Sequence, residues 1–275
     1  MLLNWSICWG QGLMIFFKHL NNTFNLSQNK STPYLSKPQN NSGLEFKNVV
    51  QDSKNFILHD KIPVSYKDGN GYLETYIEPI PDAKDSVWFI SKIADNENKT
   101  LGSYNYQVNL TSKKIGSGYI HTAGQYRHKG IGEIMRLASL MELKENNINA
   151  IEINALPEAI QFHHNYKFKP NITQRFWAIK ILQNICKNPN IQENHRQKAD
   201  SLCQHISEKT NWLLDKKKAK SVNYFIENIL KTYKSNWQTA GLSLTIPMIL
   251  TKNNMNKFSS FFNDLFKKHG INYKI

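Results

Sequence analysis

One stretch of the chain, residues 113 to 156, constrains the fold more than any other, because a strand, a helix and a second strand follow one another within it. A strand is indicated by "KKIGSGYIHTA", although Gly116 and Gly118 weaken it. A second strand is indicated by "NAIEINAL". Between the strands, apolar residues recur three and four positions apart, which predicts an amphipathic helix: Ile131, Ile134, Leu137, Ala138 and Met141. A strand, a helix and a parallel strand form the right-handed crossover of an α/β sheet, so we expect a mixed α/β fold.

Three more strands are expected before this stretch and one after it. Those before it are indicated by "GYLETYIE", "SVWFISKI" and "LGSYNYQVNL", and the turn "DNENKT" joins the last two into a hairpin. The one after it is indicated by "GLSLTIPMIL", where larger apolar residues alternate with smaller ones over residues 241 to 250. A last amphipathic helix is expected over residues 255–269.

The 275 residues suffice for one domain with an insertion, and a hydrophobic content of 40% allows a sizeable core. Residues 1–45 are expected to form an N-terminal arm or linker, because their second half, residues 21 to 45, is polar and contains two prolines. The domain is expected to cover residues 46–275 and to be interrupted by a helical insertion over residues 178–237. The apolar stripe of the first helix in this region is expected to comprise Phe176, Ile179, Leu182 and Ile185.

The charge and the cysteines narrow the classes of partner and compartment. A net charge of +14 favours anionic partners, but only Lys216 to Lys218 form a tight basic run, so no dedicated nucleic-acid motif is found. Three cysteines without C-x-x-C spacing favour a reducing compartment, the cytoplasm. The apolar start is too interrupted for a membrane span and lacks a signal-peptide pattern, and Met14 is an alternative start to Met1.

The turn "YRHKGIG" between strand and helix has the features of a phosphate site. The first turn of a helix presents unpaired N–H groups and the positive end of the helix dipole. Gly130 and Gly132 carry no side chain that would block a ligand, while Arg127 and Lys129 add positive charge. The spacing fits neither the P-loop nor the G-x-G-x-x-G fingerprint. A basic turn in solvent with no ligand is the alternative.

Two linked motifs resemble those of the GNAT N-acetyltransferase superfamily. The segment "YRHKGIGEIMRLASLMELKE" is similar to the acetyl-CoA motif of that family, Q/R-x-x-G-x-G/A followed by a helix. The segment "AIEINALPEAIQFHHNYKFKP" is similar to its next motif, a strand followed by a helix. The resemblance covers roughly residues 70 to 170. It implies a GNAT-like central mixed sheet, split into a V and flanked by helices, with an α-helical insertion before the last strand.

The resemblance implies an acetyl-CoA-dependent N-acetyltransferase that passes the acetyl group directly to an amine acceptor, with no metal. The pantetheine chain would bond the backbone of Ile120 and Thr122. The pyrophosphate would lie on the amides of the turn and the first helical residues: Arg127, His128, Lys129, Gly130, Ile131 and Gly132. The alternative is a catalytically weak binding module that keeps this cofactor site and uses the basic helical insertion to recruit an anionic or protein partner.

His163 is the candidate catalytic acid, because it stands where the family often has a Tyr that protonates the departing thiolate of CoA. An imidazolium with a pKa near 6.5 suits this task at neutral pH. The alternative is that His163 is a packing or surface residue, in which case Tyr166 or a bound water would supply the proton.

The general base is left open by the sequence. Gly116 and Gly118 occupy the strand positions where some family members carry Glu or His. The nearby candidates are therefore His121, Tyr119 and Glu152, or a chain of water molecules. Each of the three side chains can equally be structural.

Overall fold

The computed structural model describes residues 58–59, 61–79, 85–207, 211–233 and 245–275. The chain divides into two compact units, residues 1–42 and 43–275, and all described residues belong to the second. The expected N-terminal arm lies outside the described residues.

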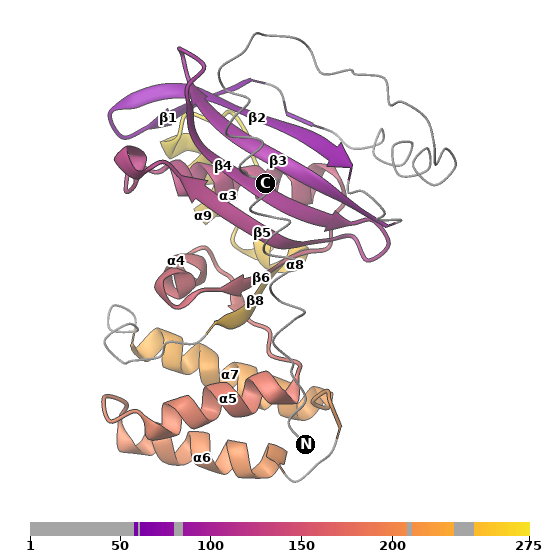
Figure 1. Cartoon of the computed structure of the whole chain (residues 1–275), viewed down its shortest axis with the longest axis vertical. Helices are drawn as coiled ribbons and strands as arrows, with labels where there is room; N and C mark the ends of the chain where they lie inside the picture. Colours follow the sequence, from indigo (N-terminus) through magenta and orange to yellow (C-terminus); the bar gives the residue numbers. More distant parts are fainter. Residues whose placement is uncertain (1–57, 60, 80–84, 208–210, 234–244) are drawn as a thin grey trace, which may run out of the picture. The chain divides into compact units, whose positions relative to one another are not determined.

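Eight strands form one mixed sheet in the order β1-β2-β3-β4-β5-β6-β8-β7 (Figure 1). Strands β1 to β5 form an antiparallel meander, β5 pairs with β6 in parallel, and β8 runs antiparallel between β6 and β7. The strands are β1 Ile62–Tyr66, β2 Gly69–Pro79, β3 Ser86–Asp95, β4 Thr100–Asn109, β5 Lys114–Thr122, β6 Ala150–Ala155, β7 Lys169–Pro170 and β8 Ile246–Thr251. The predicted crossover from β5 to β6 and the mixed α/β class are confirmed.

The sheet splits between β5 and β6. The two strands pair only at Lys114 with Ala150 and at Ile115 with Ile151, whereas β6 continues to pair with β8 along its whole length. We call the region between β5 beyond Ile115 and β6 beyond Ile151 the V. The expected V-shaped split is therefore present in the sheet.

A β-bulge lies on β5 at the start of the V. Asn105 and Gln107 of β4 are two positions apart, but their partners Tyr119 and Gly116 are three positions apart, so the extra residue is on β5. A bulge bends a strand and disrupts its local pairing. It therefore turns β5 away from its straight course where the two strands diverge.

Helix α3, Ile131–Glu145, is buried on nearly all sides. Its predicted apolar stripe is confirmed as buried, but Met135, Arg136 and Glu142 are buried as well. Besides the sheet, α8, Lys252–Lys257, and α9, Ser259–Lys268, pack against the helix, and His163 and Phe168 cover Arg136. Both α3 and α9 lie behind the strands in the view of Figure 1. The single helix expected over residues 255–269 is thus two helices, which meet at Phe258.

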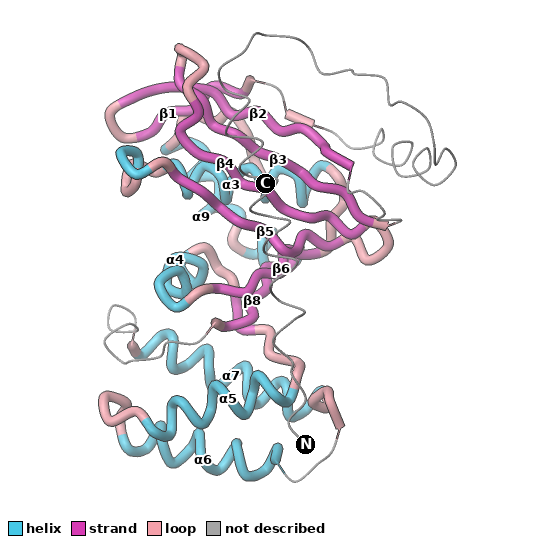
Figure 2. The backbone as a smooth tube through the Cα atoms, viewed as in Figure 1, coloured by secondary structure: helices cyan, strands magenta, loops and turns pink. Residues whose placement is uncertain are grey.

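Between β7 and β8, the described residues form the helices α5 Arg175–Lys187, α6 Glu193–Ser207 and α7 Lys216–Thr232 (Figure 2). The predicted apolar stripe of α5, Arg175–Lys187, included Phe176, and this prediction is wrong because Phe176 is 57% exposed. The helix instead buries the face that carries Ala178 and Ile181. Helix α7 buries an apolar face that comprises Val222, Phe225, Ile226, Ile229 and Leu230. The strand expected over residues 241 to 250 is observed from Ile246, and residues 241–244 lie outside the described residues.

Candidate cofactor and catalytic site

The turn before α3 has a backbone conformation that favours glycine at Gly130. Its φ is +92°, and a Cβ built on it would lie only 2.8 Å from Cε1 of His269. Gly132 differs, because a Cβ there would meet nothing within 4 Å. The first is therefore required by conformation and packing, while the second leaves the first turn of α3 open for a ligand.

Some backbone amides of the turn already donate hydrogen bonds, whereas others have no acceptor within the helix. The Arg127 amide donates to the carbonyl of Gly124 at 3.2 Å, so this amide is engaged, against the expectation that it would hold phosphate. The amide of Ile134 donates to the carbonyl of Gly130 at 3.0 Å and completes the first turn of the helix. The amides of residues 131 to 133 consequently have no acceptor within the helix, and the positive end of its dipole lies beside them.

The side chains of the turn point in different directions. Arg127 and His128 are exposed. The Nζ of Lys129 lies 3.5 Å from a carboxylate oxygen of Asp68 and 5.7 Å from the ring centroid of Tyr126, so its charge is turned toward the β1–β2 hairpin. The side chain of Ile131 is in the core, and this residue offers only its amide.

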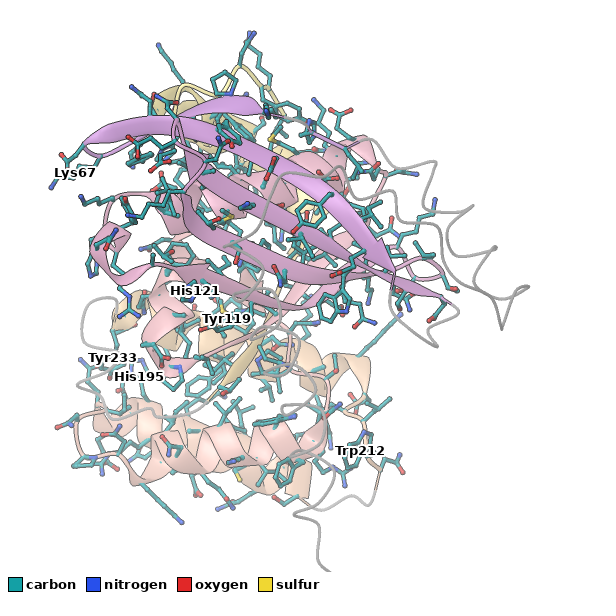
Figure 3. The ribbon with its side chains drawn as sticks, turned by 45° about the horizontal axis from the view of Figure 1, so that its top comes forward. Lys67, Tyr119, His121, His195, Trp212 and Tyr233 are labelled. Carbon is teal, nitrogen blue, oxygen red and sulfur yellow. The ribbon has the colours of Figure 1, made fainter. Side chains whose placement is uncertain are left out.

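Two segments distant in sequence hold the turn in place. The amide of Lys67, at the tip of the β1–β2 hairpin (Figure 3), donates to the carbonyl of Lys129 at 2.9 Å. The buried His269, just after α9, donates from Nδ1 to the carbonyl of Ser65 at 2.7 Å. The hairpin and the C-terminal helix thus fix the turn from two sides.

Glu133, in the first turn of α3, also contacts the residues at the end of α9. Its Oε1 lies 3.1 Å from Nε2 of His269 and 3.0 Å from Nζ of Lys268. Burial alone would raise the pKa of Glu133, but hydrogen bonds from His269, Tyr166 and Lys268 outweigh burial and lower that pKa to about 2. The carboxylate is therefore ionised and bound on the side of α3 that faces α9.

The residues expected to bond pantetheine lie on the part of β5 that borders the V. Ile120 pairs with Tyr104 of β4, and Thr122 pairs with Gly102. The other edge of β5 is released from β6 along this stretch. The turn follows this stretch of β5 in the chain.

His163 does not have the environment of an imidazolium. It lies on α4, Ile160–Asn165, and its Nδ1 is 3.5 Å from Nη2 of Arg136. Burial and the nearby guanidinium lower the pKa of His163 to about 2, so its ring is neutral at pH 7. A guanidinium only donates, so Nδ1 is the acceptor and the ring proton lies on Nε2. The physical basis for an imidazolium acid at position 163 is thereby removed.

Tyr166, the alternative acid, is also unsuited to release a proton. Burial and its hydrogen bond to the Glu133 carboxylate raise the pKa of Tyr166 above its ordinary value.

The three candidate bases differ in exposure and surroundings. Tyr119 and His121 project from β5 (Figure 3), with Tyr119 49% exposed and His121 half-buried. Glu152 is held by Lys114, whose Nζ lies 2.8 Å from Oε1. Glu152 also lines a hollow of about 200 Å³ at the start of the V, together with Gly116.

A larger hollow of about 450 Å³ lies between β7 and α7, and its lining includes none of the predicted site residues. Within the described ranges no group of three or more His, Cys, Asp or Glu side chains is placed to hold a metal ion. No helix in that part of the chain is long and apolar enough to cross a membrane.

Arg136 is the residue that the sequence did not reveal. At ~100° per residue it lies about 140° around the helix from Ile131, on the side where exposure is expected. It is instead 1% exposed, because the chain around α4 and β7 covers that side of α3. No signal in the sequence singles it out, because the helix also carries four other charged residues: Glu133, Glu142, Lys144 and Glu145.

No model of a known protein family matches the sequence, and no curated protein matches it. Among solved structures, an acetyltransferase of the GNAT family from Staphylococcus aureus Mu50 is similar, with 20% identity and a TM-score of 0.28 over 30% of this chain and 54% of that chain. The spermidine/spermine N-acetyltransferase SpeG from Vibrio cholerae, in complex with manganese ions, has 14% identity and a TM-score of 0.29 over 34% and 56%. A domain from Methanocaldococcus jannaschii has 19% identity and a TM-score of 0.28 over 34% and 62%.

The chain thus spans little more than half the length of these structures. Similarity of this extent does not assign the chain to a family.

Proposed function

We propose that the chain is an acetyl-CoA-dependent N-acetyltransferase that transfers the acetyl group directly to an amine acceptor. One observation carries the proposal: the turn at Gly130, with open amides beyond it, follows the stretch of β5 that is released from β6. A pyrophosphate and an extended chain attached to it need these two features side by side.

The residues present fit this ligand. The amides of residues 131 to 133 would bind the pyrophosphate, with the exposed Arg127 side chain supplying positive charge. The backbone of Ile120 and Thr122 would bond the pantetheine amides. Acetyl-CoA would supply the activated acetyl group. The attacking amine must lose a proton, for which Tyr119, His121 or water is available.

His163 keeps a role in the proposal, but a different one. Its neutral ring carries a proton on Nε2, and that group donates a hydrogen bond without transferring the proton. We assign it to hydrogen bonding at the sulfur end of the ligand. The proton that completes the released thiol then comes from the amine or from water, so the reaction is balanced without an imidazolium.

A thermal-shift measurement with acetyl-CoA and CoA tests the cofactor assignment. A ligand at one hundred times its Kd stabilises the folded protein by about 2.7 kcal/mol. Gly132→Val should abolish most of the shift in Tm, because a branched side chain would occupy the open space in front of the amides. Gly124→Val is the matched control, since a Cβ there also meets nothing within 4 Å but lies before the turn. An unchanged Tm of the wild type in millimolar acetyl-CoA contradicts the assignment.

A binding module without turnover is the second candidate, and one observation favours it. His163 is neutral and Tyr166 has a raised pKa, so neither side chain is poised to release a proton at pH 7. The basic helical insertion would then recruit an anionic or protein partner. Release of CoA with a panel of polyamines, peptides and aminoglycosides separates the candidates, because a binding module stabilises with acetyl-CoA but releases no CoA.

A further inference from the structure

The guanidinium of Arg136 is enclosed in the protein without a counter-charge. The residue is 1% exposed, and in the described part of the chain no carboxylate lies within 4.0 Å of it. Glu133, one turn earlier, is bound to Lys268 and His269. Burial raises the pKa of Glu142 to about 8, so that carboxyl is protonated at neutral pH and carries no charge. An arginine does not lose its proton in proteins, so the charge persists.

The contacts of this guanidinium leave one buried edge without a strong hydrogen-bond acceptor. Nη1 donates to the hydroxyl of Tyr104 at 3.1 Å and lies 3.5 Å from Oγ of Ser139. Nη2 has only the 3.5 Å contact with His163, and Nε has no hydrogen-bond partner among the residues that the structure describes. The edge formed by Nε and Nη2 is the one that receives a carboxylate side-on, through two parallel hydrogen bonds.

Two aromatic rings fix the plane of the guanidinium. Its Cζ lies 5.0 Å from the ring centroid of Tyr104 and 5.0 Å from that of Phe168. The group is therefore held in place before any anion arrives. Burying a charge without a partner is costly, and replacing buried ionic groups by apolar ones is often stabilising. A binding function explains why a residue with this cost is present.

The position of Arg136 connects it to the V. Tyr104 belongs to β4, and its hydroxyl would lie 2.8 Å from a Cβ at Gly118, an exposed residue in the bulge of β5. His163 and Phe168 belong to the α4–β7 segment on the other side of the V. The guanidinium thus contacts residues from both sides of the V, and Tyr104 alone separates it from the exposed bulge.

We propose that Arg136 binds a carboxylate of a ligand in the V, which, resting on the proposed function, is either the acyl group of a dicarboxylic acyl-CoA or the carboxylate of an amino-acid acceptor. The carboxylate takes the Nε–Nη2 edge and neutralises the buried charge. The V then selects for a negatively charged group at a fixed distance from the reacting carbonyl.

Two arms of one experiment distinguish the sources of the carboxylate. Isothermal titration compares succinyl-CoA with acetyl-CoA, and steady-state kinetics with acetyl-CoA compare ornithine with putrescine, which differ by one carboxylate. In one arm, the wild type should prefer the carboxylated compound by about tenfold or more, as expected for a bidentate charged pair. Arg136→Met should abolish that preference while binding acetyl-CoA within about twofold of the wild type.

The variants also separate binding from structure. Arg136→Met should raise the Tm of the ligand-free protein, because it removes an unpaired buried charge. Arg136→Lys keeps the positive charge but loses the forked pair of N–H donors. It should fold even if Arg136→Met does not, and it should show a reduced preference for the carboxylated compound. The proposal is overturned by a wild type without preference in both arms, or by a preference that both variants retain. A different result would show that only the proposed function is wrong. Free succinate or ornithine would then bind in a manner that requires Arg136, while no CoA compound would bind.

Discussion

At the scale of residues, the environment of a side chain decides its chemistry more than its identity does. His163 and Arg136 illustrate this, because each modifies the other. The guanidinium helps keep the imidazole neutral, and the imidazole leaves the guanidinium without a counter-charge. The turn around Gly130 could be predicted from sequence, since glycine spacing and helix polarity are local properties. The Arg136–His163 contact could not, because it joins residues 27 positions apart across the V.

The role of His163 predicts a specific pH profile. Because its pKa is about 2, kcat should show no loss of activity with rising pH near 6.5, as an imidazolium acid would require. His163→Gln retains an N–H donor and should keep kcat within about tenfold, while His163→Ala should lose less than the 10²–10⁴-fold of a positioned acid. Steady-state rates from pH 5.5 to 8.5 check this, with His164→Gln as the control at the next helical position. A limb that falls near pH 6.5 in the wild type and vanishes in His163→Gln would restore the imidazolium acid.

Glu142 predicts a pH dependence of stability. Burial raises its pKa in the folded protein to about 8, against about 4.5 when unfolded, so the folded state holds a proton that the unfolded state releases between these values. Stability from this group is therefore full below pH 4.5 and is lost as pH rises through 8. In Glu142→Gln the side chain stays neutral at every pH. Compared with the wild type, the variant should therefore gain about 1 to 3 kcal/mol more unfolding free energy at pH 8 than at pH 4.5.

Urea unfolding at both pH values measures this difference. Glu158→Gln, at an exposed position, is the matched control and should leave the pH dependence unchanged. Equal shifts of Glu142→Gln at the two pH values would contradict a protonated carboxyl.

At the scale of elements, periodicity predicted where strands and helices lie, and packing decided the faces. The helix at Ile131 and the strands β3 to β6 follow directly from apolar spacing. The stripe of α5 is wrong at Phe176, because spacing alone gives two adjacent faces and contact with α6 selects one of them. The division between α8 and α9 at Phe258 carries no proline or glycine signal.

One side chain ties the helices before β8 to the rest of the fold. Asn223 of α7 accepts from the amide of the buried Ile172 at 2.7 Å and donates to its carbonyl at 3.2 Å. Asn223→Ala should cost about 1 to 3 kcal/mol of unfolding free energy, because it leaves both backbone groups without partners. It should leave acetyl-CoA binding intact, since Asn223 lies on the far side of β8 from the turn. Urea unfolding measures the loss, with the exposed Lys220→Ala on the same helix as control. An unchanged midpoint would show that the two hydrogen bonds do not anchor α7.

At the scale of the whole described unit, the order of strands and the opening of the sheet are properties of long-range pairing. The V depends on β8 taking the edge of β6 that it pairs along, although β8 follows three helices later in the chain. Local patterns do not encode such a choice, and the V was expected only because two linked motifs resemble a known family. The bulge on β5 lies where β5 and β6 separate, in the stretch where Gly116 and Gly118 weaken the strand pattern.

The support of the turn by Ser65 and His269, 204 residues apart, has a kinetic consequence. A surface that is already in its binding conformation needs no rearrangement when a ligand arrives, so encounter alone limits the rate of association. Substitutions among the supporting residues would then act first on the fraction of molecules that are competent to bind. Substitutions at the open amides would instead change how long the ligand stays.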